Sequence, residues 1–250
     1  MIHLFTDFGL AGPYIGQVKT VLARLAFDVP AIDLLSDAPA FNPKASAYML
    51  AAYDSGCGPG DVVVGVVDPG VGSSRAAIVV EADGVWYVGP DNGMFEAVVR
   101  QAKTSPRGWE IVWCPPETSN SFHGRDIFAP IAARIASGDT PDSDCEGMYR
   151  SLSDDEFRRA DWPDDLDEVI YVDRFGNVLS GVRGDSIKET ETLCINGAIL
   201  PRRQTFSDAG PSESFCYLNS NGLMEIAVNM GRADETLGLS VGDQVTIREL

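Results

Sequence analysis

The first 140 residues alternate short apolar runs with longer segments whose apolar positions recur at helical intervals. Residues 2–6, 31–35 and 62–67 have the length and composition of strands, and residues 62–67 show no polar alternation. A continuous apolar strand is covered on both faces, and such strands belong mainly to parallel sheets. The order strand, helix, strand, helix, strand therefore predicts a mainly parallel sheet with helical crossovers.

Turn and cap residues mark the ends of these elements. Pro13 suits the first turn of one helix, and Asn42-Pro43 supplies an N-cap and a first residue for the next. Asp83-Gly84 predicts a hairpin turn, and Asp126 is expected to cap a helix. The further elements expected in this region are strands at 77–81, 85–88 and 110–114, and helices at about 94–101 and at 127–136.

The helical periodicity ends in an acidic stretch. Residues 139–167 are rich in Asp, Ser, Glu and Pro, which indicates a domain boundary. Beyond it, short apolar runs and the Asn-Gly turns at 196–197 and 221–222 predict antiparallel hairpins. We therefore expect an α/β domain at 1–150, an acidic linker at 151–167 and a smaller all-β barrel or sandwich at 168–250. The short strands expected there are at 169–172, 178–182, 193–195, 198–200, 215–219, 223–228 and 245–248.

Composition limits the possible partners. The chain has 37 acidic and 19 basic residues, a formal net charge of −18, which repels phosphate backbones and anionic membranes. Nucleic acid and membrane are therefore not expected as partners. The five cysteines are scattered without a CxxC pair, as is typical of reduced thiols in the cytoplasm. With only two histidines, a His-rich zinc site is not expected.

Two carboxylates stand where predicted strands end. Asp68 follows the buried strand and precedes a glycine-rich turn and Arg75, while Asp7 follows the first strand. In open α/β sheets, ligands bind beyond the carboxyl ends of strands, so this edge is a candidate site. His123 lies just before a helix N-terminus, which disfavours a positive charge and keeps an imidazole neutral. The alternatives are a strand-ending turn with a surface ion pair, and a capping or surface role for His123.

Six ordered segments resemble one known family. They are TDFG, VVDPGVGSSR, YVGPDNG, FHGRDIFAP, VDRFGN and NSNGLMEIAVN, which extend from residue 6 to residue 229. Together they are similar to the S-adenosyl-L-methionine (SAM) hydrolases, or SAM hydroxide adenosyltransferases, which are related to the bacterial fluorinase and chlorinase. The resemblance implies an N-terminal α/β domain, a C-terminal β-barrel and no cofactor. It also implies a homotrimer whose site lies at the subunit interface.

The resemblance also implies roles for individual residues. The catalytic set of the family matches Asp68, Arg75 and His123, and its ribose-binding aspartate matches Asp7. The remaining matches are Asn177 for adenine with Phe175 stacking nearby, Asp173 for the methionine ammonium, Ser220 for the methionine side, Glu225 for a further nucleoside contact and the Val228 backbone for adenine.

Simple chemistry is consistent with this set. A sulfonium is already a good leaving group, so displacement of methionine from the ribose C5′ requires a positioned, partly deprotonated water and no metal. Arg75 can stabilise hydroxide, a neutral His123 can accept a proton and Asp68 can orient either residue. We therefore predict hydrolysis of SAM to adenosine and L-methionine. The alternatives are a SAM-dependent 5′-halogenase and a protein that only binds adenosine or SAM.

Overall fold

The computed structural model describes residues 1–144 and 146–249. By its internal contacts the chain divides into two units, Met1–Trp162 and Pro163–Leu250. In the first unit one sheet has the strand order β2-β1-β3-β5-β4-β6-β7. Its strands are β1 (Ile2–Thr6), β2 (Ala31–Leu35), β3 (Val62–Val66), β4 (Ala77–Ala82), β5 (Val85–Pro90), β6 (Arg107–Ile111) and β7 (Tyr149–Leu152). Its helices are α1 (Tyr14–Leu25), α2 (Pro43–Tyr53), α3 (Glu96–Gln101), α4 (Ala129–Ala136) and α5 (Asp154–Phe157).

The sheet is mixed and mostly parallel. Strands β2, β1, β3 and β5 run in the same direction, whereas β4 pairs antiparallel with both β5 and β6. The predicted hairpin at Asp83-Gly84 is confirmed, with positive φ angles at both turn residues. The predicted N-cap at Asn42 is also confirmed, because its side-chain oxygen accepts a hydrogen bond from the Ala45 amide.

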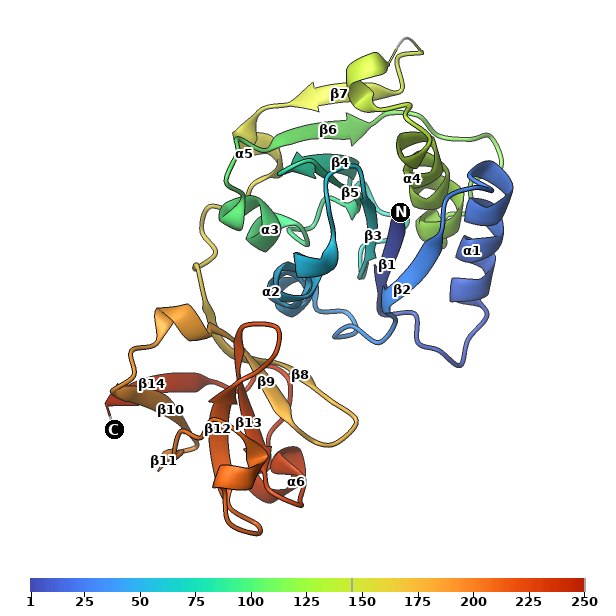
Figure 1. The fold of residues 1–250 in the computed structure, drawn as a ribbon. Coiled ribbons are helices and arrows are strands. Elements are labelled where there is room, and N and C mark those ends of the chain that lie inside the picture. Colours follow the sequence, from blue (N-terminus) through green and yellow to red (C-terminus); the bar gives the residue numbers. More distant parts are fainter. Residues whose placement is uncertain (145, 250) are drawn as a thin grey trace. The chain divides into compact units, whose positions relative to one another are not determined.

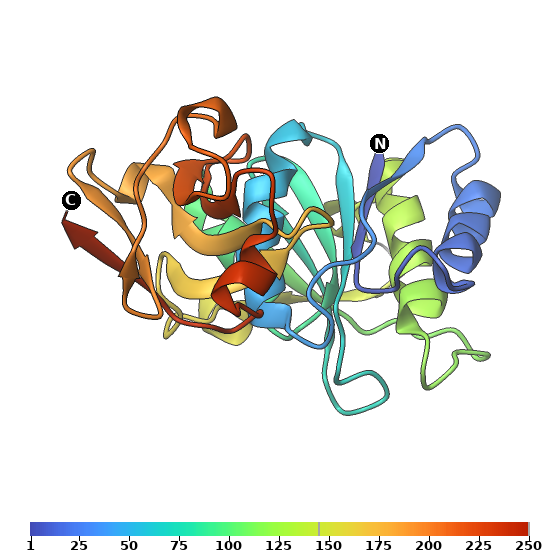
Figure 2. The ribbon, with the colours of Figure 1, turned by 90° about the horizontal axis from the view of Figure 1, so that it is seen from below.

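Helices cover both faces of the sheet (Figure 1). Helices α1 and α4 pack together on one face, and α2 and α3 pack together on the other. The same pairing of α1 with α4 is visible in Figure 2. All five residues of β3 are buried, as its continuous apolar sequence predicted for a strand covered on both faces. At Gly65 an added Cβ would lie 2.7 Å from the Phe95 ring, so the close packing of β3 against the α3 side requires glycine.

The second unit is mainly antiparallel β-structure, with the short helix α6 after its last long hairpin. Its two sheets have the orders β12-β13-β9-β8 and β11-β10-β14, and isolated bridges join Glu168 to Gln244 and Arg202 to Cys216. These pairings do not show the closed barrel that the family resemblance implies. The elements are β8 (Leu166–Val172), β9 (Val178–Arg183), β10 (Glu191–Ile195), β11 (Ala198–Ile199), β12 (Ser214–Leu218), β13 (Leu223–Val228), α6 (Ala233–Leu237) and β14 (Val245–Glu249).

Two local predictions are wrong. The strand expected at 110–114 is β6 at Arg107–Ile111, because its register is set by antiparallel pairing with β4, in which Glu81 lies opposite Arg107. Asp126 does not cap a helix. It lies inside a π-helical turn, Gly124–Phe128, that precedes α4, and its carboxylate accepts a hydrogen bond from the Ser119 amide. The expected acidic linker contains the end of β7 and all of α5.

Candidate functional site

Two carboxylates lie at the carboxyl ends of neighbouring parallel strands. Thr6 of β1 lies opposite Val66 of β3, and the Asp7 amide donates a hydrogen bond of 3.2 Å to the Val66 carbonyl. Asp7 therefore begins the loop after β1, and Asp68 begins the loop after β3. Burial, and to a smaller extent the charge of Asp68, raises the pKa of the Asp7 carboxyl. The carboxyl-edge position predicted for both residues is confirmed.

Arg75 links Asp68 to His123. Its Nη2 donates a hydrogen bond of 2.6 Å to Asp68 Oδ2 and lies 3.0 Å from His123 Nδ1. The side chains of Arg75 and Asp68 are 8% and 5% exposed, so this ion pair is almost fully removed from water. The centroid of the Phe128 ring lies 5.5 Å from the Arg75 guanidinium carbon, a distance typical of a cation–π contact. The surface ion pair considered as an alternative does not fit this burial.

The contact with Arg75 determines the state of His123. An arginine nitrogen can only donate, so Nδ1 must accept and the neutral imidazole carries its proton on Nε2. The pKa of His123 is lowered, first by burial and then by the positive charge of Arg75. The neutral state predicted from the helix N-terminus is thus supported by burial and by Arg75. In the described part of the chain, Nε2 has no hydrogen-bond partner.

Two buried polar atoms of this set have no partner. Asp68 Oδ1 and Arg75 Nε are both buried, and neither makes a hydrogen bond to the described residues. Buried polar atoms are nearly always hydrogen-bonded, so a pair of exceptions at one site requires an explanation. An acceptor and a donor beside a charged pair are suited to a water molecule or a polar ligand.

A cavity of about 150 Å³ lies beside Asp68 and His123. Asp7, Asp68 and His123 line it together with Phe8 and Phe41. Phe41 is 79% exposed and has a φ of 59°, a conformation uncommon for non-glycine residues, and its amide donates a weak 3.4 Å hydrogen bond to Asp7 Oδ2. Residues with uncommon backbone angles of this kind are found most often at functional sites. Phe41 gave no signal in the sequence, because backbone angles cannot be read from residue type.

The glycine-rich turn brings the Arg75 loop against the His123 loop. Gly72 has a φ of 79°, and a Cβ there would lie 2.5 Å from the carbonyl oxygen of Asn120. The position therefore requires glycine both for its backbone angle and for the close approach of the two loops. The YVGPDNG segment supports the same region, because Asn92 Nδ2 donates to the Val67 carbonyl and the Asp91 amide donates to the Ala76 carbonyl. Asn92 is a positioning residue that the sequence analysis missed.

In the second unit, the predicted binding residues form another group. Asp173 Oδ1 accepts hydrogen bonds from the Phe175 and Asn177 amides, and Asp173 Oδ2 accepts one of 2.9 Å from Asn177 Nδ2. The Asp173 carboxylate thus orients the side-chain amide of Asn177. The Oδ1 atom of Asn177 remains available as an acceptor. Phe175 is 73% exposed at the tip of this turn. Such exposure of an aromatic ring is suited to stacking on a planar ligand.

Glu225 lies on β13 near this turn. It is buried, and its carboxylate accepts hydrogen bonds from the Tyr217 hydroxyl at 2.5 Å and from Asn219 Nδ2 at 2.9 Å. Burial, and to a smaller extent the charge of Asp173, raises the pKa of Glu225. Val228 is buried at the end of β13, whereas Ser220 is exposed in the β12–β13 turn. The sequence analysis missed Tyr217 and Asn219, which fix the Glu225 carboxylate.

The predicted site residues thus fall into two groups, one in each unit. Asp7, Asp68, Arg75 and His123 lie together in the first, and Asp173, Phe175, Asn177 and Glu225 lie close to one another in the second. Among residues 1–144 and 146–249, no three His, Cys, Asp or Glu side chains gather closely enough to hold a metal ion. The helices that the structure describes include none with the length and apolar character needed to span a bilayer.

The fold and site define a two-unit protein, with an α/β domain that carries a hydrogen-bonded Asp-Arg-His set at its sheet edge and a smaller antiparallel β-region. Family models for the SAM hydroxide adenosyltransferase N-terminal and C-terminal domains match residues 2–144 and 167–246. The chain therefore belongs to the SAM hydroxide adenosyltransferase family.

The chain is similar to individual relatives over nearly its whole length. The chain is 35% identical to the (R)-S-adenosyl-L-methionine hydrolase of Thermus thermophilus, with 98% of each chain covered. It is 33% identical to the enzyme of the same name from Salinispora tropica, with 98% of this chain and 97% of the relative covered. The crystal structure of an uncharacterized conserved protein from Thermotoga maritima superposes with a TM-score of 0.87 at 29% identity, covering 99% of this chain and all of the other.

Proposed function

We propose that this protein is a cytoplasmic enzyme that hydrolyses SAM to adenosine and L-methionine. The observation that carries the proposal is the hydrogen-bonded Asp68, Arg75 and His123 set, which lies near Asp7 at the carboxyl edge of the sheet. The names of the relatives from Thermus thermophilus and Salinispora tropica support the same reaction. In this reaction a water oxygen forms a bond to C5′ while the C5′–S bond breaks. The electron pair leaves with sulfur, which becomes the neutral thioether of methionine, and one proton is released.

The attacking water is proposed to bind between the unpartnered atoms of the set. Asp68 Oδ1 is a free acceptor for one water hydrogen, and the positive charge of Arg75 stabilises the developing hydroxide. His123 Nε2–H is available to donate to the water oxygen. Because Arg75 occupies the lone pair of Nδ1, His123 is proposed to orient the water, and Asp68 rather than His123 is proposed to accept its proton.

The substrate is proposed to contact both groups of residues. Asp7 is suited to the ribose diol, since a carboxylate can accept two hydrogen bonds from neighbouring hydroxyls. Asn177 Oδ1 can accept from the exocyclic amine of adenine, and Phe175 can stack on its ring. Asp173 is proposed to face the methionine ammonium, with Ser220 on the methionine side and with Glu225 and the Val228 backbone on the nucleoside side.

The two groups are proposed to meet in a homotrimer. Asp7, Asp68, Arg75 and His123 belong to the first unit, while Asn177 and its neighbours belong to the second. The family resemblance implies that the first unit of one subunit and the second unit of the next form each site. The trimer is therefore proposed to be the catalytic assembly.

Incubation of SAM with the pure protein tests the proposal. We expect adenosine and methionine in equal amounts, without an effect of a chelator, because the sulfonium leaving group needs no Lewis acid. Chromatography with and without chloride distinguishes the alternatives. Formation of mainly 5′-chloroadenosine would indicate a halogenase, and unchanged SAM after long incubation with stoichiometric protein would indicate a protein that only binds its ligand.

The state of His123 leads to a prediction about pH. Since burial and Arg75 lower the pKa of His123, the imidazole should titrate below the ordinary value of about 6.5. Protonation puts a hydrogen on Nδ1, which can then no longer accept from Arg75, so kcat/KM should fall on the acid side only as pH drops through this lowered pKa. Imidazole NMR measures the titration directly, and the signal that disappears in His123→Gln identifies the residue.

Arg75→Gln provides the control for this titration. Removal of the positive charge should raise the pKa of His123, because one of the two causes of its depression is lost. An unchanged titration in Arg75→Gln, or a wild-type pKa at or above about 6.5, would contradict the electrostatic coupling of these two residues.

A further inference from the structure

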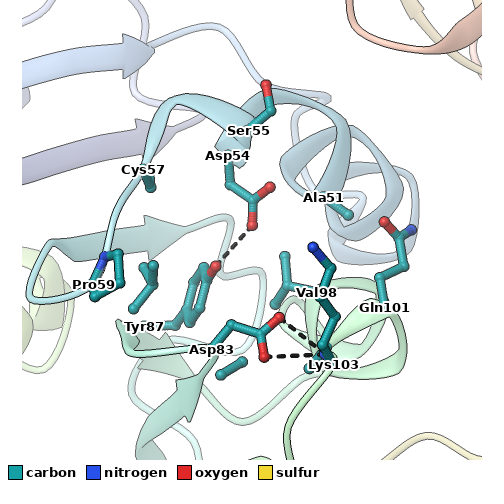
Figure 3. A pocket seen from close by; sticks show the side chains of 13 residues that line it. Ala51, Asp54, Ser55, Cys57, Pro59, Asp83, Tyr87, Val98, Gln101 and Lys103 are labelled. Atoms are coloured by element: carbon teal, nitrogen blue, oxygen red, sulfur yellow. Dashed lines mark hydrogen bonds between the residues drawn. The ribbon is translucent and has the colours of Figure 1, made fainter.

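A second cavity lies at the opposite edge of the sheet from the Asp-Arg-His set. Figure 3 shows the side chains that line it. It is bordered by Cys57 and Pro59 before β3 and by Asp83 and Val85 at the start of β5, so it faces the amino ends of these strands. Its volume is about 290 Å³, at the lower end of the range for small-molecule sites. The five residues of β3 span roughly 16 Å, which separates this cavity from Asp68.

One side of the cavity is anionic. Asp54 follows the last residue of α2, and its Oδ2 accepts a hydrogen bond of 2.7 Å from the Tyr87 hydroxyl. Burial raises the pKa of this carboxyl, although the hydrogen bond from Tyr87 acts in the opposite direction. The C-terminal end of α2 adds partial negative charge at the same place. An ammonium group would therefore be favoured beside Asp54.

The other side of the cavity carries a cation. The Lys103 amide is fixed by hydrogen bonds of 3.0 and 2.9 Å to the Asp83 carboxylate, which also accepts from the Thr104 amide and hydroxyl. These hydrogen bonds and, to a smaller extent, the charge of Lys103 lower the pKa of Asp83. The Lys103 side chain extends into the cavity (Figure 3), and no ion pair joins it to Asp54 in the described part of the chain. A ligand carboxylate would be favoured beside this ammonium, with the Gln101 amide also in reach.

Part of the cavity wall is apolar. Ala51, Val85 and Val98 line it together with the Tyr87 ring, which is 3% exposed. An apolar ligand side chain would bury its surface there, which favours binding by roughly 25 cal/mol for each Å² removed from water. The cavity thus offers a carboxylate, an ammonium and an apolar wall within one small volume.

We propose that this cavity binds a free α-amino acid with an apolar side chain, as the zwitterion. The ligand ammonium lies against Asp54, its carboxylate lies against Lys103, and its side chain lies against Val85, Val98 and the Tyr87 ring. The site does not depend on the reaction at the other edge. The choice of L-methionine as first probe does rest on the proposed function, because that reaction would release it.

Cys57 provides a reporter at the cavity itself. It is a free, half-buried thiol on the cavity wall, whereas Cys114 is an exposed free thiol elsewhere in the same unit. Burial and nearby carboxylates raise the pKa of Cys57 to about 11, so its alkylation at pH about 8 is slow enough to follow by peptide mass spectrometry. A bound ligand that covers Cys57 should slow alkylation about tenfold at ten times its Kd, while the rate at Cys114 stays unchanged.

Ligand analogues and matched variants test each contact. N-acetyl-L-methionine lacks the ammonium and the methyl ester lacks the carboxylate, so both should protect Cys57 at least about tenfold less well than L-methionine. Asp54→Asn, which can still accept from Tyr87, and Lys103→Gln should raise the half-protecting concentration by a similar factor. The controls are Asp33→Asn and Lys19→Gln, an ion pair with a 2.7 Å separation on β2 and α1, which should have no effect.

The protection experiment has results that support the proposed site and results that overturn it. Protection of Cys57 by L-methionine or L-leucine that is lost in Asp54→Asn and Lys103→Gln supports the site. No protection by either amino acid, or equal protection by the N-acetyl derivative, overturns it. SAM turnover is measured separately, so failure of the proposed reaction would leave the protection result unaffected, and the reverse also holds.

Discussion

His123→Ala and Arg75→Ala are expected to lower the kcat of SAM hydrolysis by at least about tenfold, while adenosine binding persists. Both side chains act on the attacking water in the proposed mechanism, through the hydrogen bond of 3.0 Å between Arg75 Nη2 and His123 Nδ1. Arg75→Ala also leaves the Asp68 carboxylate buried without its partner, so this variant should have the larger effect. Turnover is measured by chromatography, and adenosine affinity is measured by calorimetry.

Asp7→Ala is the contrasting variant. Loss of a charged hydrogen-bond acceptor for the ribose should weaken adenosine binding by roughly 1.5–3 kcal/mol. Asp7 is separate from the hydrogen-bonded chain that joins Asp68, Arg75 and His123, although it lines the same cavity. An equal loss of adenosine affinity in all three variants would contradict this division of roles. Thermal unfolding of each variant excludes a loss of folded protein as the cause.

Mixing two inactive variants should restore activity if the site is shared between subunits. In a trimer of His123→Ala and Asn177→Ala chains, an intact site needs the first unit of an Asn177→Ala chain next to the second unit of a His123→Ala chain. At equal mixing each condition holds for half of the interfaces, so about a quarter of the sites should be intact. The expected activity after dissociation and reassembly is therefore about a quarter of the wild-type value.

The design of this experiment depends on exchange and on the choice of residues. His123 lies in the first unit and Asn177 in the second, so the two substitutions never meet in an intact site. A mixture of His123→Ala with Arg75→Ala is the matched control, because both changes fall in the first unit and no interface becomes complete. Absence of recovery at every mixing ratio, with subunit exchange verified by mass spectrometry, would indicate a site within one chain or a different assembly.

Local sequence signals predicted most of the sheet. The apolar strand that became β3, the Asn42 cap and the Asp83-Gly84 hairpin all follow from the conformational preferences of a few neighbouring residues. The strand that became β6 was misplaced by three residues, because its register depends on β4, which is distant in sequence. Asp126 was misassigned for a different reason, since its carboxylate accepts a hydrogen bond from the Ser119 amide in the preceding loop and does not cap the following helix.

The sequence by itself determined that Asp7 and Asp68 stand at the carboxyl ends of strands, because strand length and turn chemistry are local properties. The residue pattern made Arg75 and His123 candidates, and the resemblance implied catalytic roles for them, but neither gave their geometry. Only the tertiary structure decided that Arg75 donates to both partners and that His123 carries its proton on Nε2. It also revealed the strained Phe41 and the cavity at Asp54 and Lys103. These features arise where distant segments pack together, and burial and hydrogen-bond direction are set by that packing and not by residue type.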